Sequence, residues 1–197
     1  MSMKVLDGDG SAFYVDAEGA GSVGDPAKLL RVLEGGYRQI QVEITRPANT
    51  TAYSANDAVA DNAPSITTHI LAGAARKVGG TGSIVRASVA TDKIDSTMAL
   101  FMVVYNAAPA GGFTADNAAF SFKYADIGKK VGIIPFPAVA VAAAGGAGCA
   151  PYARVDGLNI PFKTVAVDDL YFELYQKGTP TPASGQKFYF DIGVIQD

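Results

Sequence analysis

A single histidine, His69, and a single cysteine, Cys149, limit the chemistry open to this chain. Any serine or cysteine nucleophile with an imidazole base must use His69, and a multi-histidine metal site is excluded. His69 lies in a strand-like pattern between Thr68 and Ile70, where a half-exposed or hydrogen-bonded histidine is the default. Cys149 lies in the Ala/Gly-rich run 138–150 with no histidine nearby, so we expect a structural thiol.

The carboxylates closest in sequence are Asp168 with Asp169 and Asp92 with Asp95. General acid–base catalysis needs two carboxyl groups that converge across a cleft in unequal environments. Neighbouring residues on a strand point to opposite faces instead. We therefore interpret both pairs as aspartates of turns and strand ends.

A calcium loop is weakly indicated near the N-terminus. Asp7, Asp9, Ser11 and Glu18 fall on its first, third, fifth and twelfth positions. The sixth position requires glycine and is Ala12, and no flanking helices are expected. Turns rich in Gly and Asp produce this spacing by chance.

Two further motifs also fail as binding sites. The glycine-rich run 79–83 is followed by neither Lys-Ser/Thr nor a helix, so we predict a flexible hairpin loop instead of a phosphate cradle. Asn49-Thr50-Thr51 matches a glycosylation sequon, which matters only on a secretory route. The sequence therefore predicts no catalytic, cofactor-binding or metal-binding residues.

Composition indicates a folded chain with a weakly charged surface. Of its 197 residues, 49% are hydrophobic and 18% charged, and the net charge is −3. Basic residues are scattered, and we interpret Arg76-Lys77 and Lys129-Lys130 as solvated loop charges, so direct nucleic-acid binding is not expected. No apolar signal segment follows the start, and glycine and proline break the apolar stretch 131–144, so no membrane span is expected.

From Tyr37 onward the pattern favours β-strands. Ile40, Val42 and Ile44 alternate with polar residues, as in a strand with one wet face. Further strands are predicted at 65–71, 82–91, 98–106, 118–124, 131–136, 160–167, 169–176 and 187–195. Turn clusters separate them, which favours an all-β antiparallel sandwich or a barrel. The runs 98–106 and 169–176 are apolar on both faces and should be central strands.

Residues 1–36 differ from the domain predicted at 37–197. They contain many turn signals but only one short apolar patch, at 13–15. We predict an extended arm or small hairpin, in which Asp25-Pro26 could open a short helix through Leu33. Such an arm could hold a neighbour in an assembly, and a frayed terminus explains it equally well.

Aromatic residues mostly fall at strand spacing, and we expect most of them in the core. The absence of Trp and of convergent acids weakens a sugar-binding interpretation. The residues concerned are Tyr105, Phe120, Phe122, Tyr124, Tyr171, Phe172, Tyr175, Phe188, Tyr189 and Phe190.

Several segments, in order, resemble tailed-phage structural proteins. Residues 49–59 are similar to a "T-x-Y-x-x-x-D-x-V" opening, and residues 74–84 to an "A-R-x-x-G-G-S/T-G-x-I" stretch. Residues 100–109 and 116–120 resemble its "L-x-L-F-x-x-x-P … D-N-A-A-F" continuation. Residues 169–172, 179–184 and 194–197 also fit, so the resemblance spans about 50 to 197.

The resemblance implies a virion protein made in the host cytoplasm, with a jelly-roll-like sandwich that trimerises on the capsid shell. The expected function is capsid decoration, with the major capsid protein and further copies of the chain as partners, and without nucleic acid, membrane, cofactor or catalysis. One alternative is a tail or fibre component that contacts the host surface. Another is a glycan hydrolase on a β scaffold, for which the sequence offers no good carboxylate pair.

Overall fold

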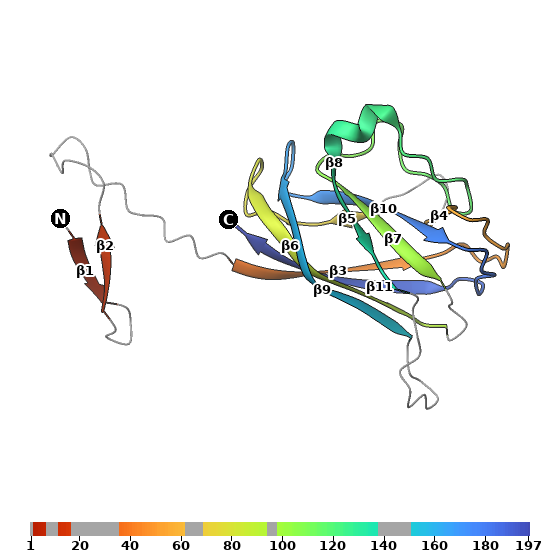
Figure 1. The fold of residues 1–197 in the computed structure, drawn as a ribbon, viewed down its shortest axis with the longest axis horizontal. Coiled ribbons are helices and arrows are strands. Elements are labelled where there is room, and N and C mark those ends of the chain that lie inside the picture. The colour runs from red at the N-terminus through yellow and green to blue at the C-terminus, as the bar shows by residue number, and fades with distance from the viewer. Residues whose placement is uncertain (1, 7–11, 17–35, 62–68, 94–97, 138–150) are drawn as a thin grey trace. The chain divides into compact units, whose positions relative to one another are not determined.

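The computed structural model describes residues 2–6, 12–16, 36–61, 69–93, 98–137 and 151–197 (Figure 1). Chain contacts divide the protein into two compact units, Met1–Glu34 and Gly35–Asp197. In the first unit, β1 (Ser2–Leu6) pairs antiparallel with β2 (Ala12–Asp16). The helix predicted through Leu33 lies outside the described residues.

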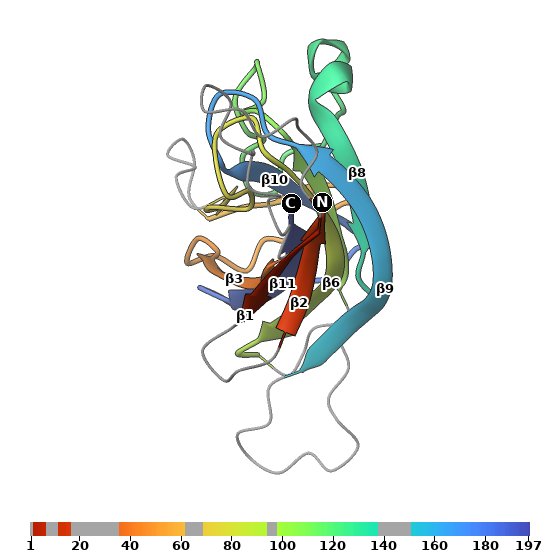
Figure 2. The same cartoon turned by 90° about the vertical axis from the view of Figure 1, so that its left-hand side faces the viewer.

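The second unit is an antiparallel β-sandwich, which confirms the predicted fold class. One sheet has the order β3 (Gly36–Thr45), β11 (Lys187–Gln196), β6 (Thr81–Thr91) and β9 (Tyr152–Lys163). The other has the order β4 (Ala58–Val59), β10 (Leu170–Lys177), β7 (Ala99–Tyr105) and β8 (Lys130–Pro135). In this second sheet β5 (Ile70–Leu71) also pairs with β10. The two sheets form the two layers seen in Figures 1 and 2.

Strand pairing in the second unit is nested along the chain. The first strand, β3, pairs with the last, β11, over ten residue pairs. The short strands β4 and β5 both pair with β10, β6 pairs with β9, and β7 pairs with β8. Each sheet therefore combines segments from distant parts of the sequence.

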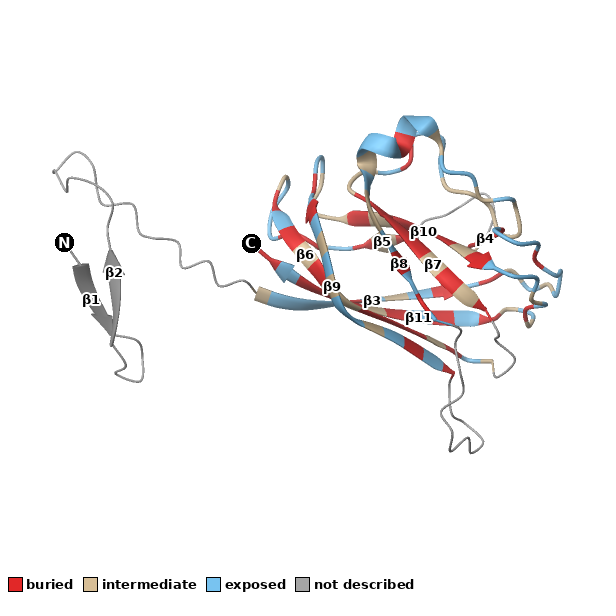
Figure 3. Ribbon diagram, in the orientation of Figure 1, coloured by how far each residue is buried: buried red, intermediate tan, exposed pale blue. Residues whose placement is uncertain are grey.

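The core lies between the two sheets and follows the predicted alternation. Phe188, Phe190, Ile192 and Val194 of β11 are all fully buried (Figure 3). They belong to the same cluster as the inward residues of the facing strands, which include Leu100, Met102, Val104, Leu170, Phe172 and Leu174. Burying one such side chain contributes about 1.5–3 kcal/mol, so this layer supplies most of the stabilisation.

A covering segment, residues 113–122, lies over the outer face of β10 and β7. Thr114 hydrogen-bonds to Glu173 of β10, and the ring of Phe120 stacks on Tyr175 at 4.9 Å. As a result Val103 is buried although it faces away from the core. The central positions predicted for 98–106 and 169–176 are confirmed, and this cover explains their second apolar face.

Two strand predictions and one loop prediction need correction. Residues 118–124 form no strand and contribute one isolated bridge, Asp57 to Ala119, before the 3₁₀ helix η1 (Tyr124–Lys129). The strand predicted at 160–167 is the end of β9, which begins at Tyr152 and ends at Lys163. Its first half was missed because the exposed charges of Arg154 and Asp156 hide the apolar pattern. The run 79–83 is not simply a loop, since its last three residues are in β6. Of the strand predicted at 65–71, only 69–71 are among the described residues, and β5 covers the last two.

Candidate functional site

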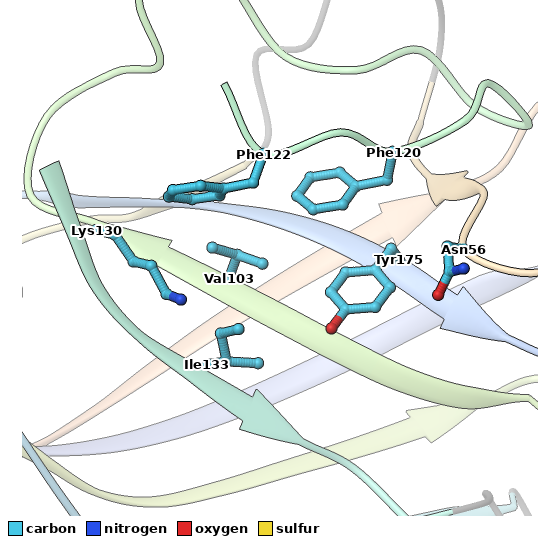
Figure 4. Close-up of a pocket in the computed structure, with 7 residues that line it drawn as sticks. All are labelled: Asn56, Val103, Phe120, Phe122, Lys130, Ile133 and Tyr175. Carbon is cyan, nitrogen blue, oxygen red and sulfur yellow. The ribbon is translucent and has the colours of Figure 1, made fainter. Parts of the chain in front are cut away.

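A groove lies on the outer face of the sheet formed by β8, β7 and β10. It has a volume of about 400 Å³ and is shown in Figure 4. Its lining consists of Asn56, Val103, Phe120, Phe122, Lys130, Ile133 and Tyr175.

Three strands and the covering segment position these side chains. Val103 of β7 and Tyr175 of β10 form the floor, because alternate residues of each strand point away from the core (Figure 4). Ile133, the register partner of Val103, provides the β8 wall. Phe122 provides the opposite wall, with its ring stacked on Tyr105 at 6.1 Å. The covering segment thus completes a groove that the strands alone would leave flat.

Few polar groups reach the groove. The Lys130 ammonium lies 5.1 Å from the centre of the Phe122 ring, a cation–π distance. Asn56 is at the other end, in the left-handed backbone region with φ of 68°, which asparagine tolerates. Its backbone donates to Gln176 and accepts from Phe120, both at 2.9 Å. Burial raises the pKa of the Tyr175 phenol.

Exposed apolar side chains and lysines gather beside the groove. We call residues Phe122, Lys123, Tyr124, Ile127, Lys129, Lys130 and Ile133 the basic apolar patch. Tyr124 and Ile127 of η1 are 90% and 55% exposed, and Phe122 and Ile133 are each 37% exposed. Asp126, the acidic residue within this stretch, is buried. A hydrogen bond from the Ala110 amide and the nearby Lys129 ammonium lower the pKa of its carboxyl group.

A buried ionic network holds the other end of the covering segment. Arg46 pairs with Asp116 at 2.9 Å, with side chains 0% and 4% exposed. The Tyr53 hydroxyl accepts from Arg46 Nε and donates to Asp116 Oδ1 at 2.5 Å. Asp116 Oδ1 also accepts from the Ala60 amide at 3.1 Å. Desolvation by burial, followed by the Asp116 charge, raises the pKa of Tyr53.

A second buried carboxylate, Glu173, fastens the covering segment to β10. Its Oε1 accepts from the Thr114 amide and hydroxyl at 2.8 and 2.9 Å, and its Oε2 accepts from the Tyr105 hydroxyl at 2.8 Å. Burial and then the Glu173 charge raise the pKa of Tyr105. Every bond here ties one segment to another, so the carboxylate has a structural role.

His69 was expected to be half-exposed or hydrogen-bonded; it is buried, and neither of its ring nitrogens has a hydrogen-bond partner among the described residues. It is 1% exposed, stacks on Phe172 at 5.1 Å and meets the edge of Phe113 at 5.6 Å. Its Nε2 lies 4.0 Å from Asp61 Oδ1. Burial lowers the pKa of the imidazole to about 4, against the opposing effect of Asp61. A neutral ring packed between aromatic rings cannot reach substrate.

The remaining sequence candidates are not brought together. Asp169 accepts from the Gly73 amide at 2.7 Å and Asp92 from the Lys187 amide at 2.8 Å, as aspartates of turns do. In the sequon, Asn49 accepts from the Thr51 amide at 3.2 Å. Asp7, Asp9, Ser11 and Glu18 of the calcium spacing, together with Asp95 and Cys149, lie outside the described residues.

Among the described residues, no three His, Cys, Asp or Glu side chains are grouped so that they could hold a metal ion. Within the same residues, no helix has the length and apolar character needed to cross a membrane.

No protein-family model matches this chain, and a search of curated proteins finds no significant match.

The groove was not foreseen from the sequence. Most aromatic residues were expected in the core, yet Phe172, Phe188 and Phe190 alone of the ten belong to the core cluster. The sequence pattern predicts a strand that contains Phe120 and Phe122, whereas both belong to the covering segment. The available signal was the second apolar face of 98–106, which requires a cover from outside the sandwich.

Proposed function

We propose that this protein decorates the capsid of a tailed bacteriophage, binding the outer shell and stabilising it without catalysing a reaction. The observation that carries the proposal is the nested pairing of strands. The strands at the two ends of the unit, β3 and β11, pair with each other. The strands between them pair in the same way, and β7 with β8 is the innermost pair. From this order we infer a jelly-roll, an architecture used by viral capsid and lectin domains.

Fold alone does not determine function. The resemblance of residues 50–197 to tailed-phage structural proteins favours the virion over the lectin use. The side-chain chemistry of the described residues is compatible with this choice, because the buried carboxylates Asp116 and Glu173 are occupied by structural hydrogen bonds.

The proposed mechanism is mechanical. Copies of the chain, as trimers, bridge neighbouring major capsid subunits and resist the outward pressure of packaged DNA. Many weak contacts made together hold more strongly than one contact alone, because each bound site raises the effective concentration of the next. Such a role needs a rigid scaffold, and the sandwich core provides one.

The test is binding to shells of the phage that encodes the chain, prepared without this protein. Added protein should co-sediment with the shells, give symmetric density on their outer surface by cryo-electron microscopy and raise their thermal stability. Light scattering of the purified protein should report a trimer. A monomer that leaves the shells unchanged would refute the proposal.

A second candidate is a tail or fibre component that contacts the host surface. The observation that favours it is the groove, whose aromatic lining and polar ends suit a ligand-contacting surface. Immunogold labelling of intact virions separates the two candidates, since label would gather on the shell in one case and on the tail in the other.

A further inference from the structure

We propose that the groove and the basic apolar patch form a docking site for a protein segment that places a large apolar side chain beside a carboxylate. The inference deepens the proposed function, because on a decoration protein the partner is the shell protein. It relies on that function only for the partner's identity. The chemistry of the partner follows from the groove itself.

The first argument is the concentration of exposed apolar area. Four large apolar side chains are exposed in the short stretch of chain that contains η1 and the start of β8. They are Phe122, Tyr124, Ile127 and Ile133. Contiguous exposed apolar side chains beside a concavity mark interaction sites, whereas single ones need no explanation. The groove volume of about 400 Å³ is within the range of pockets that take a large side chain.

The second argument is charge. The stretch from Phe122 to Ile133 has three lysines and one aspartate, in a chain whose net charge is −3. Because Asp126 is buried and paired with Lys129, the exposed charges of the stretch are positive. The Lys130 ammonium lies over Phe122 at the groove wall and has no ion-pair partner among the described residues. A partner carboxylate would complement it.

The third argument distinguishes a peptide from a sugar or a lipid surface. A glycan presents hydroxyl groups all round and needs many hydrogen-bonding partners, but the lining supplies mainly Asn56, Lys130 and the Tyr175 hydroxyl. A lipid surface would meet the exposed Tyr124 and Ile127, but it could not reach the groove floor, where Val103 is 1% exposed. An apolar side chain would fill the groove, and an adjacent carboxylate would pair with the Lys130 ammonium.

The experiment titrates the isotope-labelled full chain with the capped peptide Asp-Phe-Asp-Leu-Asp and follows backbone amide shifts by NMR. Shifts should be confined to residues of the groove and patch. The matched peptide Lys-Phe-Lys-Leu-Lys should bind about tenfold more weakly. Vesicles of phosphatidylcholine with phosphatidylserine, and a sulfated oligosaccharide, are the competing probes.

Two matched pairs of variants locate the site. Ile133→Ser and Lys130→Glu should each weaken peptide binding about tenfold. Ile195→Ser and Lys187→Glu should leave it unchanged, since Ile195 is 38% exposed, almost the same fraction as Ile133, and both controls lie on β11 of the other sheet. All four positions are exposed, so the fold is retained in each variant.

Each outcome decides the proposal. Localised peptide shifts that the groove variants weaken support the proposal, even if the chain does not bind shells, in which case the decoration function fails alone. Peptide shifts scattered over both sheets, or binding of vesicles or oligosaccharide without peptide binding, overturn it. Shell binding that Ile133→Ser and Lys130→Glu leave intact overturns the assignment of the shell protein as the partner of this site, while the decoration function stands.

Discussion

Arg46 and Asp116, 70 residues apart in the chain, form an ion pair of 2.9 Å that is almost completely buried. The pair connects the loop after β3 to the covering segment. With Tyr53 between them, each charge is neutralised and hydrogen-bonded, which makes burial tolerable.

Asp116→Asn should therefore destabilise the fold strongly. Removing one partner of a buried pair leaves an uncompensated charge and costs about 3–5 kcal/mol. Urea unfolding followed by circular dichroism measures the loss. The control is Asp156→Asn, since the Arg154–Asp156 pair is 47% and 58% exposed and should contribute at most about 1 kcal/mol. Equal losses in the two variants would contradict a special role for the buried pair.

Glu173→Ala should loosen the covering segment. The variant removes the three hydrogen bonds that the carboxylate accepts and leaves the buried Tyr105 hydroxyl without its acceptor. The free energy of unfolding should fall by about 1–3 kcal/mol. Hydrogen exchange should accelerate at the Thr114 amide more than at the central amides of β11. Exchange that is unchanged at Thr114 would show that other contacts hold the segment.

Acid should weaken the fold through His69. Its pKa is about 4 when folded and 6.5 as an unperturbed side chain, so the unfolded chain binds more protons between these values. The stabilisation is fully present above about pH 6.5 and is lost progressively as the pH falls toward 4. Thermal melts of the wild type and His69→Phe across this range test it. The variant should lose less stability on acidification, and parallel curves would assign the acid sensitivity to other groups.

Gly82→Ala should be destabilising although Gly82 is in a regular strand. An added Cβ would lie 2.5 Å from the Ile195 carbonyl oxygen and 2.6 Å from the Phe162 ring, and the backbone oxygen cannot move aside cheaply. The expected cost is about 1–3 kcal/mol. Gly128→Ala is the control, because nothing lies within 4 Å of its added Cβ. Differential scanning calorimetry should show a lower Tm for the first variant alone.

Strand positions could be predicted where alternation was strong. The pattern of β11 identified four fully buried residues, and Ile40 and Ile44 of β3 behave in the same way. Prediction failed where a partner distant in sequence sets the environment. Phe120 looks like a strand residue, yet its ring rests on Tyr175 and its backbone bonds to Asn56.

The buried polar groups were equally inaccessible to sequence reasoning. Arg46 is a charged residue directly before Pro47, which indicates an exposed strand end. Only the fold brings Asp116 and Tyr53 to it, so their pairing has no local signature. The strand pattern around His69 predicts a half-exposed or hydrogen-bonded side chain. It does not reveal the burial, because Phe113 and Phe172 reach the imidazole from distant segments.

The nested pairing has a consequence for how the protein is made. Gly36, at the start of β3, pairs with Gln196, at the end of β11, so β3 cannot complete its sheet until β11 has been synthesised. Nascent chains that still lack β11 would expose the apolar faces of β3 and β6. A premature stop anywhere before Lys187 should therefore yield aggregates instead of a shortened, functional protein.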